Sequence, residues 1–245
     1  MTLQSEIIWK KIHASAKNML VQEPALESLV YQVVLANDTM GQGLGQLLAH
    51  HQFDTLMGYD ELSVLFQSVY AKSPEIVERA AADLEAVIDG DPAATDHLVP
   101  YLYFKGFHAL QTYRVAHVLW QDGREHMALF LQNRSSLLYG VDIHPAAQIG
   151  KGIMFDHATG IVIGETSVVE DGVAIFHGAT LGGTGTQRGD RHPKIRRGVM
   201  VGSGATILGN IEIGENTTVA AGSMVLKDMP ANATVVGIPA RVVTS

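Results

Sequence analysis

The chain has 245 residues, of which 47% are hydrophobic and 17% charged, and its formal net charge at pH 7 is −8. This length is enough for one large domain or for two smaller domains with their own cores. The negative charge argues against a nucleic-acid partner, because proteins of that class usually present a basic face to the phosphates.

The sequence contains no run of about 18 or more apolar residues, so we expect no membrane span. The amphipathic N-terminal segment lacks the apolar stretch and cleavage site of a signal peptide, so we expect a cytoplasmic protein. The absence of cysteine excludes disulfides, thiolate metal ligands and a cysteine nucleophile. Catalysis would therefore depend on His, Asp, Glu, Lys, Ser or backbone groups.

Apolar residues in the first part of the chain follow helical spacing. In residues 73–92 they recur at i, i+3 and i+4, which predicts a helix. Ser73 can cap this helix, Pro74 suits its first turn, and Gly90 and Pro92 predict its end. Residues 26–36, 59–71 and 107–121 show the same pattern. We expect about seven or eight helices across residues 2–139.

After residue 140 the apolar period becomes six, which fits neither a helix nor an ordinary amphipathic strand. A slip of two residues separates the first two of three runs. The apolar positions are Ile143, Ile149, Phe155 and Ile161; Ile163, Val169, Ile175 and Leu181; and Val201, Ile207, Ile213, Val219 and Val225. Small or modest side chains often follow four residues later, at Ala147, Thr159, Ser167, Ala179, Ala205, Thr217 and Ser223.

This period is typical of a parallel β-helix in which three hexapeptides form one triangular coil. Known hexapeptide solenoids of this type wind left-handed, against the usual rule for parallel crossovers. We therefore predict an α+β chain, with an all-helical domain over residues 1–140 and a left-handed parallel β-helix over 141–245. Between Leu181 and Val201 the polar, glycine-rich segment GGTGTQRGDRHPKIRRG breaks the period, so residues 183–198 should protrude as one loop.

Two polar groups interrupt the repeat and are candidates for chemistry. Asp156 and His157 stand inside it, and Asp142 precedes His157 by about one coil, so its carboxylate could approach the imidazole from the stacked coil. A carboxylate in that position holds an imidazole in one tautomer and supports its positive charge. The loop carries a second polar set at residues 190–192, which a solenoid surface does not need.

The segments around these residues resemble the serine O-acetyltransferases, hexapeptide-repeat enzymes of cysteine biosynthesis. The resemblance covers residues 141–165, 181–195, 209–226 and 237–243, and the segment DPAATDHLVPYLYFKGFHALQTYR at 91–114. Hexapeptide repeats occur in many acyltransferases, but the combination of DHATG, GGTG…GDRHPKI and DP…KGFHALQ is specific. The resemblance implies transfer of an acetyl group from acetyl-CoA, as co-substrate, to the hydroxyl of L-serine, with no permanently bound cofactor and no metal.

The resemblance also implies catalytic roles. His157 matches the general base that takes the proton from the serine hydroxyl, and Asp142 matches its dyad partner. A positioned base contributes roughly 10²–10⁴ in rate. Direct transfer in a ternary complex is favoured, because the chain has a histidine base and no cysteine.

Four residues match positions that bind the amino-acid substrate in this family. Asp91 and Asp156 correspond to residues that hold its α-ammonium group, and Arg191 and His192 to residues that face its carboxylate. The chemistry agrees, because arginine offers a forked donor to a carboxylate and two carboxylates suit an ammonium.

The resemblance places CoA in the groove between neighbouring β-helices of a homotrimer, held largely by backbone groups. The matching positions are Gly183, Thr184, Ser203, Ala205 and Ala221. The resemblance further implies that the helical halves pair two trimers into a hexamer. L-cysteine differs from L-serine by one atom, so the same groups should bind it, and we expect it to inhibit competitively.

Many members of this family end in a flexible tail, with isoleucine as its last residue, that docks in O-acetylserine sulfhydrylase. The sequence ends GIPARVVTS, soon after the last repeat. We therefore expect this chain to bind the sulfhydrylase weakly or not at all.

Three other functions remain open from the sequence. Another hexapeptide acetyltransferase, acting on a sugar or antibiotic hydroxyl, would differ only in its acceptor pocket. A gamma-type zinc carbonic anhydrase would use three histidines in a zinc site between subunits, for which His144, His157 and His177 are candidates. His177 lies one coil beyond His157 once the two-residue slip is counted. A non-catalytic solenoid would need neither polar set.

Overall fold

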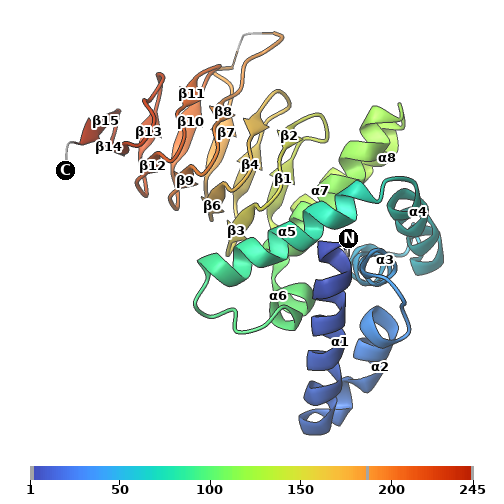
Figure 1. Cartoon of the computed structure of the whole chain (residues 1–245). Coiled ribbons are helices and arrows are strands. Elements are labelled where there is room, and N and C mark those ends of the chain that lie inside the picture. The colour runs from blue at the N-terminus through green and yellow to red at the C-terminus, as the bar shows by residue number, and fades with distance from the viewer. Residues whose placement is uncertain (1–2, 186–187, 244–245) are drawn as a thin grey trace. The chain divides into compact units, whose positions relative to one another are not determined.

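The computed structural model describes residues 3–185 and 188–243 (Figure 1). The chain divides into two compact units, Met1–Phe104 and Lys105–Ser245, called here the helical unit and the solenoid unit. The solenoid unit therefore begins with two helices before the change from helix to strand near residue 140. Among the described residues, no helix combines the length and apolar character needed to cross a membrane.

The helical unit is built from amphipathic helices around one apolar core. The largest fully buried side chains include Ile8, Leu44, Phe66, Leu84 and Tyr101. Its elements are α1 (Gln4–Gln22), η1 (Pro24–Leu26), α2 (Glu27–Val30), η2 (Tyr31–Leu35), α3 (Met40–Gln52), α4 (Tyr59–Lys72), α5 (Glu75–Gly90) and α6 (Leu98–Tyr103).

The helix predicted over residues 73–92 is α5, and it ends as expected at Gly90. The predicted side-chain cap at Ser73 is wrong. Pro74 occupies the N-cap position without a side-chain cap bond, and Ser73 instead accepts a hydrogen bond at its backbone carbonyl from the Ile76 N–H (3.2 Å). Asp91 is the C-cap residue of this helix, so the helix end fixes its place in the fold.

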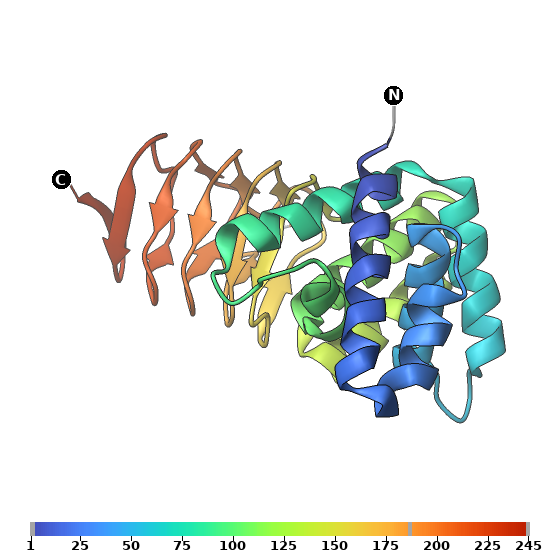
Figure 2. The ribbon, with the colours of Figure 1, turned by 60° about the horizontal axis from the view of Figure 1, so that its bottom comes forward.

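The solenoid unit starts with α7 (Lys105–Gln121) and α8 (Glu125–Tyr139), followed by a series of short strands that stack in chain order along the solenoid (Figures 1 and 2). The strands are β1 (Val141–Ile143), β2 (Gln148–Ile149), β3 (Met154–Asp156), β4 (Ile161–Ile163), β5 (Val168–Val169), β6 (Ala174–Phe176), β7 (Thr180–Gly182), β8 (Lys194–Ile195), β9 (Met200–Val201), β10 (Thr206–Leu208), β11 (Glu212–Ile213), β12 (Thr218–Val219), β13 (Met224–Val225), β14 (Thr234–Gly237) and β15 (Ala240–Val243).

Successive strands join three different sheets, which is the topology of a parallel β-solenoid. The sheet orders are β1-β4-β7-β10-β13, β2-β5-β8-β11 and β3-β6-β9-β12-β14-β15. All pairings between these strands are parallel except the final one, between β14 and β15. The hexapeptide β-helix predicted from the six-residue period is thus confirmed.

The repeat residues form the core of the solenoid. All the apolar positions of the three predicted runs are buried, and equivalent residues pair directly from coil to coil, as Ile163 does with Leu181. Most of the small residues four positions later are buried as well, which fits a crowded corner. Thr159 is the exception, because it is exposed.

Two insertions interrupt this regular packing. The first lies at the corner between β3 and β4: Ile143 pairs with Ile163, twenty residues on, whereas Ile163 pairs with Leu181, eighteen residues on. The two extra residues explain the slip seen in the sequence. They fall within residues 157–160, so His157 sits at an enlarged corner.

The second insertion is shorter than the loop predicted over residues 183–198. Lys194 and Ile195 form β8, which pairs with β5 and β11, and Ile195 is fully buried. The six-residue period therefore resumes at Ile195, six residues before Val201. The charged residues on either side of Ile195 made this repeat position hard to recognise in the sequence. Residues 186 and 187 of the predicted loop lie outside the described residues.

We predict that Ile195→Ala lowers the thermal unfolding midpoint by about 4 °C or more, because it removes a fully buried side chain from the core. Arg188→Ala, at an exposed loop position, is the control and should change the midpoint by less than about 2 °C. Circular dichroism measures both. Equal small shifts would mean that Ile195 belongs to the loop rather than to the core.

Candidate active site

The enlarged corner holds His157 in an unusual backbone conformation. His157 and Ala158 both have left-handed φ angles, 53° and 56°. For residues other than glycine this conformation costs roughly 1–2 kcal/mol each. The tight turn is closed by hydrogen bonds from the N–H of Ala158 to the carbonyl of Asp156 (2.6 Å) and from the N–H of Thr159 to the carbonyl of His157 (2.7 Å). Ala158 is fully buried, whereas the His157 side chain is 80% exposed.

The first residues of α7 support this corner from one side. A Cβ atom built on Gly106 would overlap the carbonyl oxygen of Phe155 and press against the Cβ of Ala158. Lys105 donates a hydrogen bond from Nζ to Oγ1 of Thr159. The strained turn is thus packed on a helix, so it can hold the imidazole at a fixed place on the solenoid.

The contacts of His157 are with its sequence neighbour and with the next coil. Its Nε2 lies 4.0 Å from Oδ2 of Asp156. Its ring meets that of His177 edge to face, with centroids 5.9 Å apart. The register, in which Asp156 pairs with Phe176, agrees with the predicted position of His177 one coil beyond His157.

Asp142 makes its contacts elsewhere. It lies in β1, pairs with Val162 of the next coil, and accepts a hydrogen bond at Oδ1 from Nε2 of Gln132 (2.6 Å) in α8. The structure therefore does not stack Asp142 under His157, and the dyad between them stays a prediction. No spacing rule links Gln132 to Asp142, because one belongs to a helix and the other to the repeat.

The predicted carboxylate-binding residues lie together at the base of the loop. Arg191 donates from Nη2 to Oε2 of Glu165 (2.6 Å) and from Nη1 to the carbonyl of Gly189 (3.1 Å). The hydrogen bond from Arg191 lowers the pKa of Glu165. Sequence reasoning missed Glu165; its only signal is that it ends the DHATGIVIGE segment, where a structural repeat does not need an acid.

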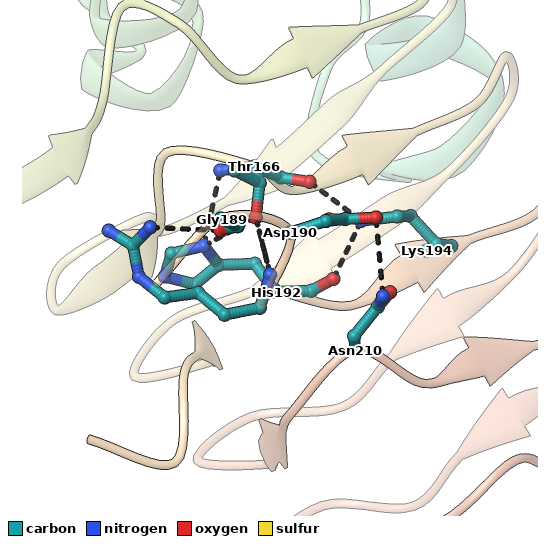
Figure 3. Close-up of polar contacts among 7 residues, drawn as sticks. Thr166, Gly189, Asp190, His192, Lys194 and Asn210 are labelled. Atoms are coloured by element: carbon teal, nitrogen blue, oxygen red, sulfur yellow. Dashed lines mark hydrogen bonds and ion pairs between the residues drawn. The ribbon is translucent and has the colours of Figure 1, made fainter. Parts of the chain in front are cut away.

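His192 is buried beside Arg191. Its Nδ1 lies 3.1 Å from the N–H of Thr166 and 2.9 Å from the Thr166 hydroxyl (Figure 3). Burial, followed by the charge of Arg191, lowers its pKa. Its ring occupies the space that a Cβ on Gly164 would fill, so only glycine fits at position 164.

A lysine joins the loop to the solenoid. Lys194 donates from Nζ to Oδ1 of Asp190 (2.6 Å), to the carbonyl of Thr166 (2.8 Å) and to the carbonyl of His192 (2.9 Å). Asn210 donates to the other oxygen of Asp190 (3.2 Å) (Figure 3). The hydrogen bond from Lys194 lowers the pKa of Asp190. These bonds fix the loop base against β8 and the neighbouring corner.

A small hollow of about 300 Å³ lies beside these residues. Its lining includes Gln148, Glu165, Thr166, Asp190 and Lys194. Charged groups of both signs face it, which suits a small polar molecule better than an apolar one.

Asp91, the other residue predicted to bind the ammonium group, belongs to the helical unit. Its Oδ1 accepts a hydrogen bond from the N–H of Ala93 (2.8 Å) in the turn that follows α5. That Asp91 and Asp156 together bind the ammonium group of the substrate stays a prediction.

The positions predicted to contact CoA differ in exposure. Thr184 and Ala221 are exposed, and Gly183 and Ser203 are partly buried. Ala205 is fully buried; its N–H donates to Gly202 and its carbonyl accepts from the N–H of Thr180, so it serves the solenoid scaffold. The CoA contacts of these residues stay predictions.

The three histidines of the zinc alternative do not form one cluster in the chain. His144 packs edge to face on Trp120, with centroids 5.1 Å apart, and burial lowers its pKa. Within residues 3–185 and 188–243, no group of three metal-ligating His, Asp or Glu side chains converges.

A parallel solenoid of hexapeptide repeats is the fold of the hexapeptide-repeat transferases. Residues 192–227 match the family model described as bacterial transferase hexapeptide (six repeats). Residues 8–112 match the model described as serine acetyltransferase, N-terminal. The chain is 50% identical over 238 residues to the serine acetyltransferase of Salmonella typhimurium, covering 97% of this chain and 87% of that protein. The chain belongs to the serine acetyltransferase family.

Solved structures agree along nearly the whole chain. A soybean serine acetyltransferase complexed with serine has a TM-score of 0.96 at 45% identity, covering 99% of this chain and 100% of that one. A Brucella abortus serine acetyltransferase in complex with coenzyme A has a TM-score of 0.95 at 46% identity, covering 98% and 96%. A serine acetyltransferase in complex with cysteine has a TM-score of 0.95 at 48% identity, covering 97% and 98%.

We predict that Gly106→Ala lowers kcat at least about tenfold, because the added methyl must displace either α7 or the His157 corner. Steady-state kinetics with acetyl-CoA and serine measure the effect. Gly45→Ala is the matched control: it adds a methyl within α3, where the nearest atoms belong to the flexible side chain of Gln67. An unchanged kcat in Gly106→Ala would show that this packing does not hold the corner.

Proposed function

We propose that this protein is a serine O-acetyltransferase, which transfers the acetyl group of acetyl-CoA to the hydroxyl of L-serine and releases O-acetyl-L-serine and CoA. The observation that carries the proposal is the extent of the family match: 50% identity to a curated relative over 97% of the chain. The exposed His157 at the enlarged corner of an otherwise regular solenoid supports it, because acetyl transfer to a hydroxyl needs a positioned base.

In the proposed mechanism, His157 takes the proton from the serine hydroxyl as that oxygen attacks the thioester carbonyl of acetyl-CoA. The tetrahedral intermediate then expels the CoA thiolate, which takes the proton back from the imidazolium. Asp142 supports the positive charge of the imidazolium in this proposal. Gln132 holds Oδ1 of Asp142 in the free protein, which leaves the other carboxylate oxygen to accept a hydrogen bond from His157.

The acceptor is recognised at both of its charged groups. Asp156 and Asp91 bind the ammonium group, and Arg191 and His192 bind the carboxylate. In the free protein Glu165 already holds Arg191 at 2.6 Å, so the substrate carboxylate has to share or displace that contact. This competition favours a ligand with a full negative charge, because a neutral acceptor would not compensate Arg191 for a lost ion pair.

We infer the binding place of the donor and the assembly from the family resemblance. We infer that CoA lies along the solenoid near Gly183, Thr184, Ser203, Ala205 and Ala221, in a groove between two subunits of a trimer. We infer that two such trimers pair through their helical units into a hexamer. We also infer a cytoplasmic location, where the acetyl-CoA that the reaction consumes is available.

We predict serine-dependent release of CoA thiol from acetyl-CoA, read with a thiol reagent, since the protein has no cysteine of its own to react. His157→Ala should lower kcat by roughly 10²–10⁴, because it removes the general base. His177→Ala, which removes the neighbouring imidazole 5.9 Å away, is the control and should retain most of the activity. Release with a sugar acceptor but not with serine would refute the proposed substrate.

We predict that L-cysteine raises the apparent KM for L-serine and leaves kcat unchanged, because its ammonium and carboxylate groups bind the same residues. Initial rates at several cysteine concentrations measure this, with D-cysteine as the control of opposite handedness. A fall in kcat with no change in the KM for serine would place the inhibitor outside the serine site.

A further inference from the structure

The hydroxyl of Thr166 is completely engaged at the loop base. Oγ1 accepts hydrogen bonds from the N–H of Arg191 (3.0 Å) and from the N–H of His192 (3.1 Å), and it lies 2.9 Å from Nδ1 of His192 (Figure 3). A hydroxyl has one proton to donate and two lone pairs to accept with. Because the two N–H groups occupy both lone pairs, the hydroxyl proton is left for an acceptor, and it is shared between Nδ1 of His192 (2.9 Å) and the carboxylate of Asp190, whose pKa this bond also lowers.

The same ring nitrogen receives a second donor. The backbone N–H of Thr166 lies 3.1 Å from Nδ1 of His192. Two donors that face one imidazole nitrogen require that nitrogen to be unprotonated. A neutral ring in this position carries its single proton on Nε2.

We propose that Thr166 is a positioning residue: it fixes His192 as the neutral tautomer with its proton on Nε2, so that His192 presents a hydrogen-bond donor to the carboxylate of the acceptor. The donor role rests on the proposed function. The tautomer is a property of the free protein and stands independently of the substrate.

The surroundings of His192 favour the same state. Burial and the positive charges of Arg191 and Lys194 oppose protonation, as does His144. Glu165 acts in the opposite direction. The net effect is a lowered pKa, with burial as the largest cause.

The hydrogen bonds to Nδ1 also select the orientation of the His192 ring. The ring edge formed by Cδ2 and Nε2 of His192 lies against Gly164, in the space of a missing Cβ. A half-turn of the ring would bring Cδ2 in place of Nδ1 against the two Thr166 donors and leave both without an acceptor, which is unfavourable for buried groups. Thr166 thus selects the orientation of the ring as well as its tautomer.

The test combines a spectroscopic and a kinetic measurement on the full chain. In ¹⁵N-histidine NMR spectra without substrate, neutral His192 should show an unprotonated Nδ1 and a protonated Nε2, and its ring should titrate at a lower pH than a free imidazole. The signal is assigned by its loss in His192→Asn. A protonated Nδ1 in the wild-type protein would overturn the proposal.

Thr166→Val removes the hydroxyl and keeps the shape, whereas Thr166→Ser restores the hydroxyl. Thr166→Val should raise the pKa of His192 and raise the KM for serine about threefold to tenfold, with the KM for acetyl-CoA nearly unchanged, and Thr166→Ser should restore both values. An unchanged His192 titration and serine KM in folded Thr166→Val would overturn the proposal. Wild-type protein with the expected tautomer but no serine-dependent activity would instead refute the proposed function.

Discussion

The in-register stacking of buried apolar side chains is the constraint on which the rest of the solenoid unit depends. Each coil must place residues such as Ile143, Ile163 and Leu181 directly above one another, because a shift of one residue would turn the strand's apolar face outward. Extra residues are therefore tolerated only at corners. The chain has two such insertions, the corner at 157–160 and the loop that begins after β7, and each carries residues with candidate chemical roles.

The two insertions are held in different ways. The His157 corner accepts two left-handed residues and is supported by Gly106 and Lys105 at the start of α7. The loop is held by side chains of the solenoid: the Thr166 hydroxyl accepts a hydrogen bond from the N–H of Arg191, and Lys194 donates to Asp190. In both cases the scaffold is ordered before substrate binds, so little of the binding energy is spent on ordering it.

The sequence predicted most of the fold, because a six-residue apolar period is typical of a hexapeptide β-helix and apolar residues at i, i+3 and i+4 are typical of helices. The predicted loop extended to residue 198, beyond its actual end before β8. The buried repeat residue Ile195 was not recognised because charged residues, Lys194 and Arg196, stand on both sides of it. The sequence identified the polar residues of the candidate site by type and motif. It could not predict Glu165, Gln132 or Thr166 as their partners, because those contacts depend on corner geometry and on a helix that packs against the first coil.

The proposed mechanism requires the two insertions to contribute to one site, with the base on one and the carboxylate-binding residues on the other. The most direct test is a crystal structure of the protein with L-serine and CoA. The account predicts the serine hydroxyl about 2.6–3.2 Å from Nε2 of His157, with the serine carboxylate on Arg191 and His192. Serine bound away from His157, or with its carboxylate facing Asp156, would contradict it.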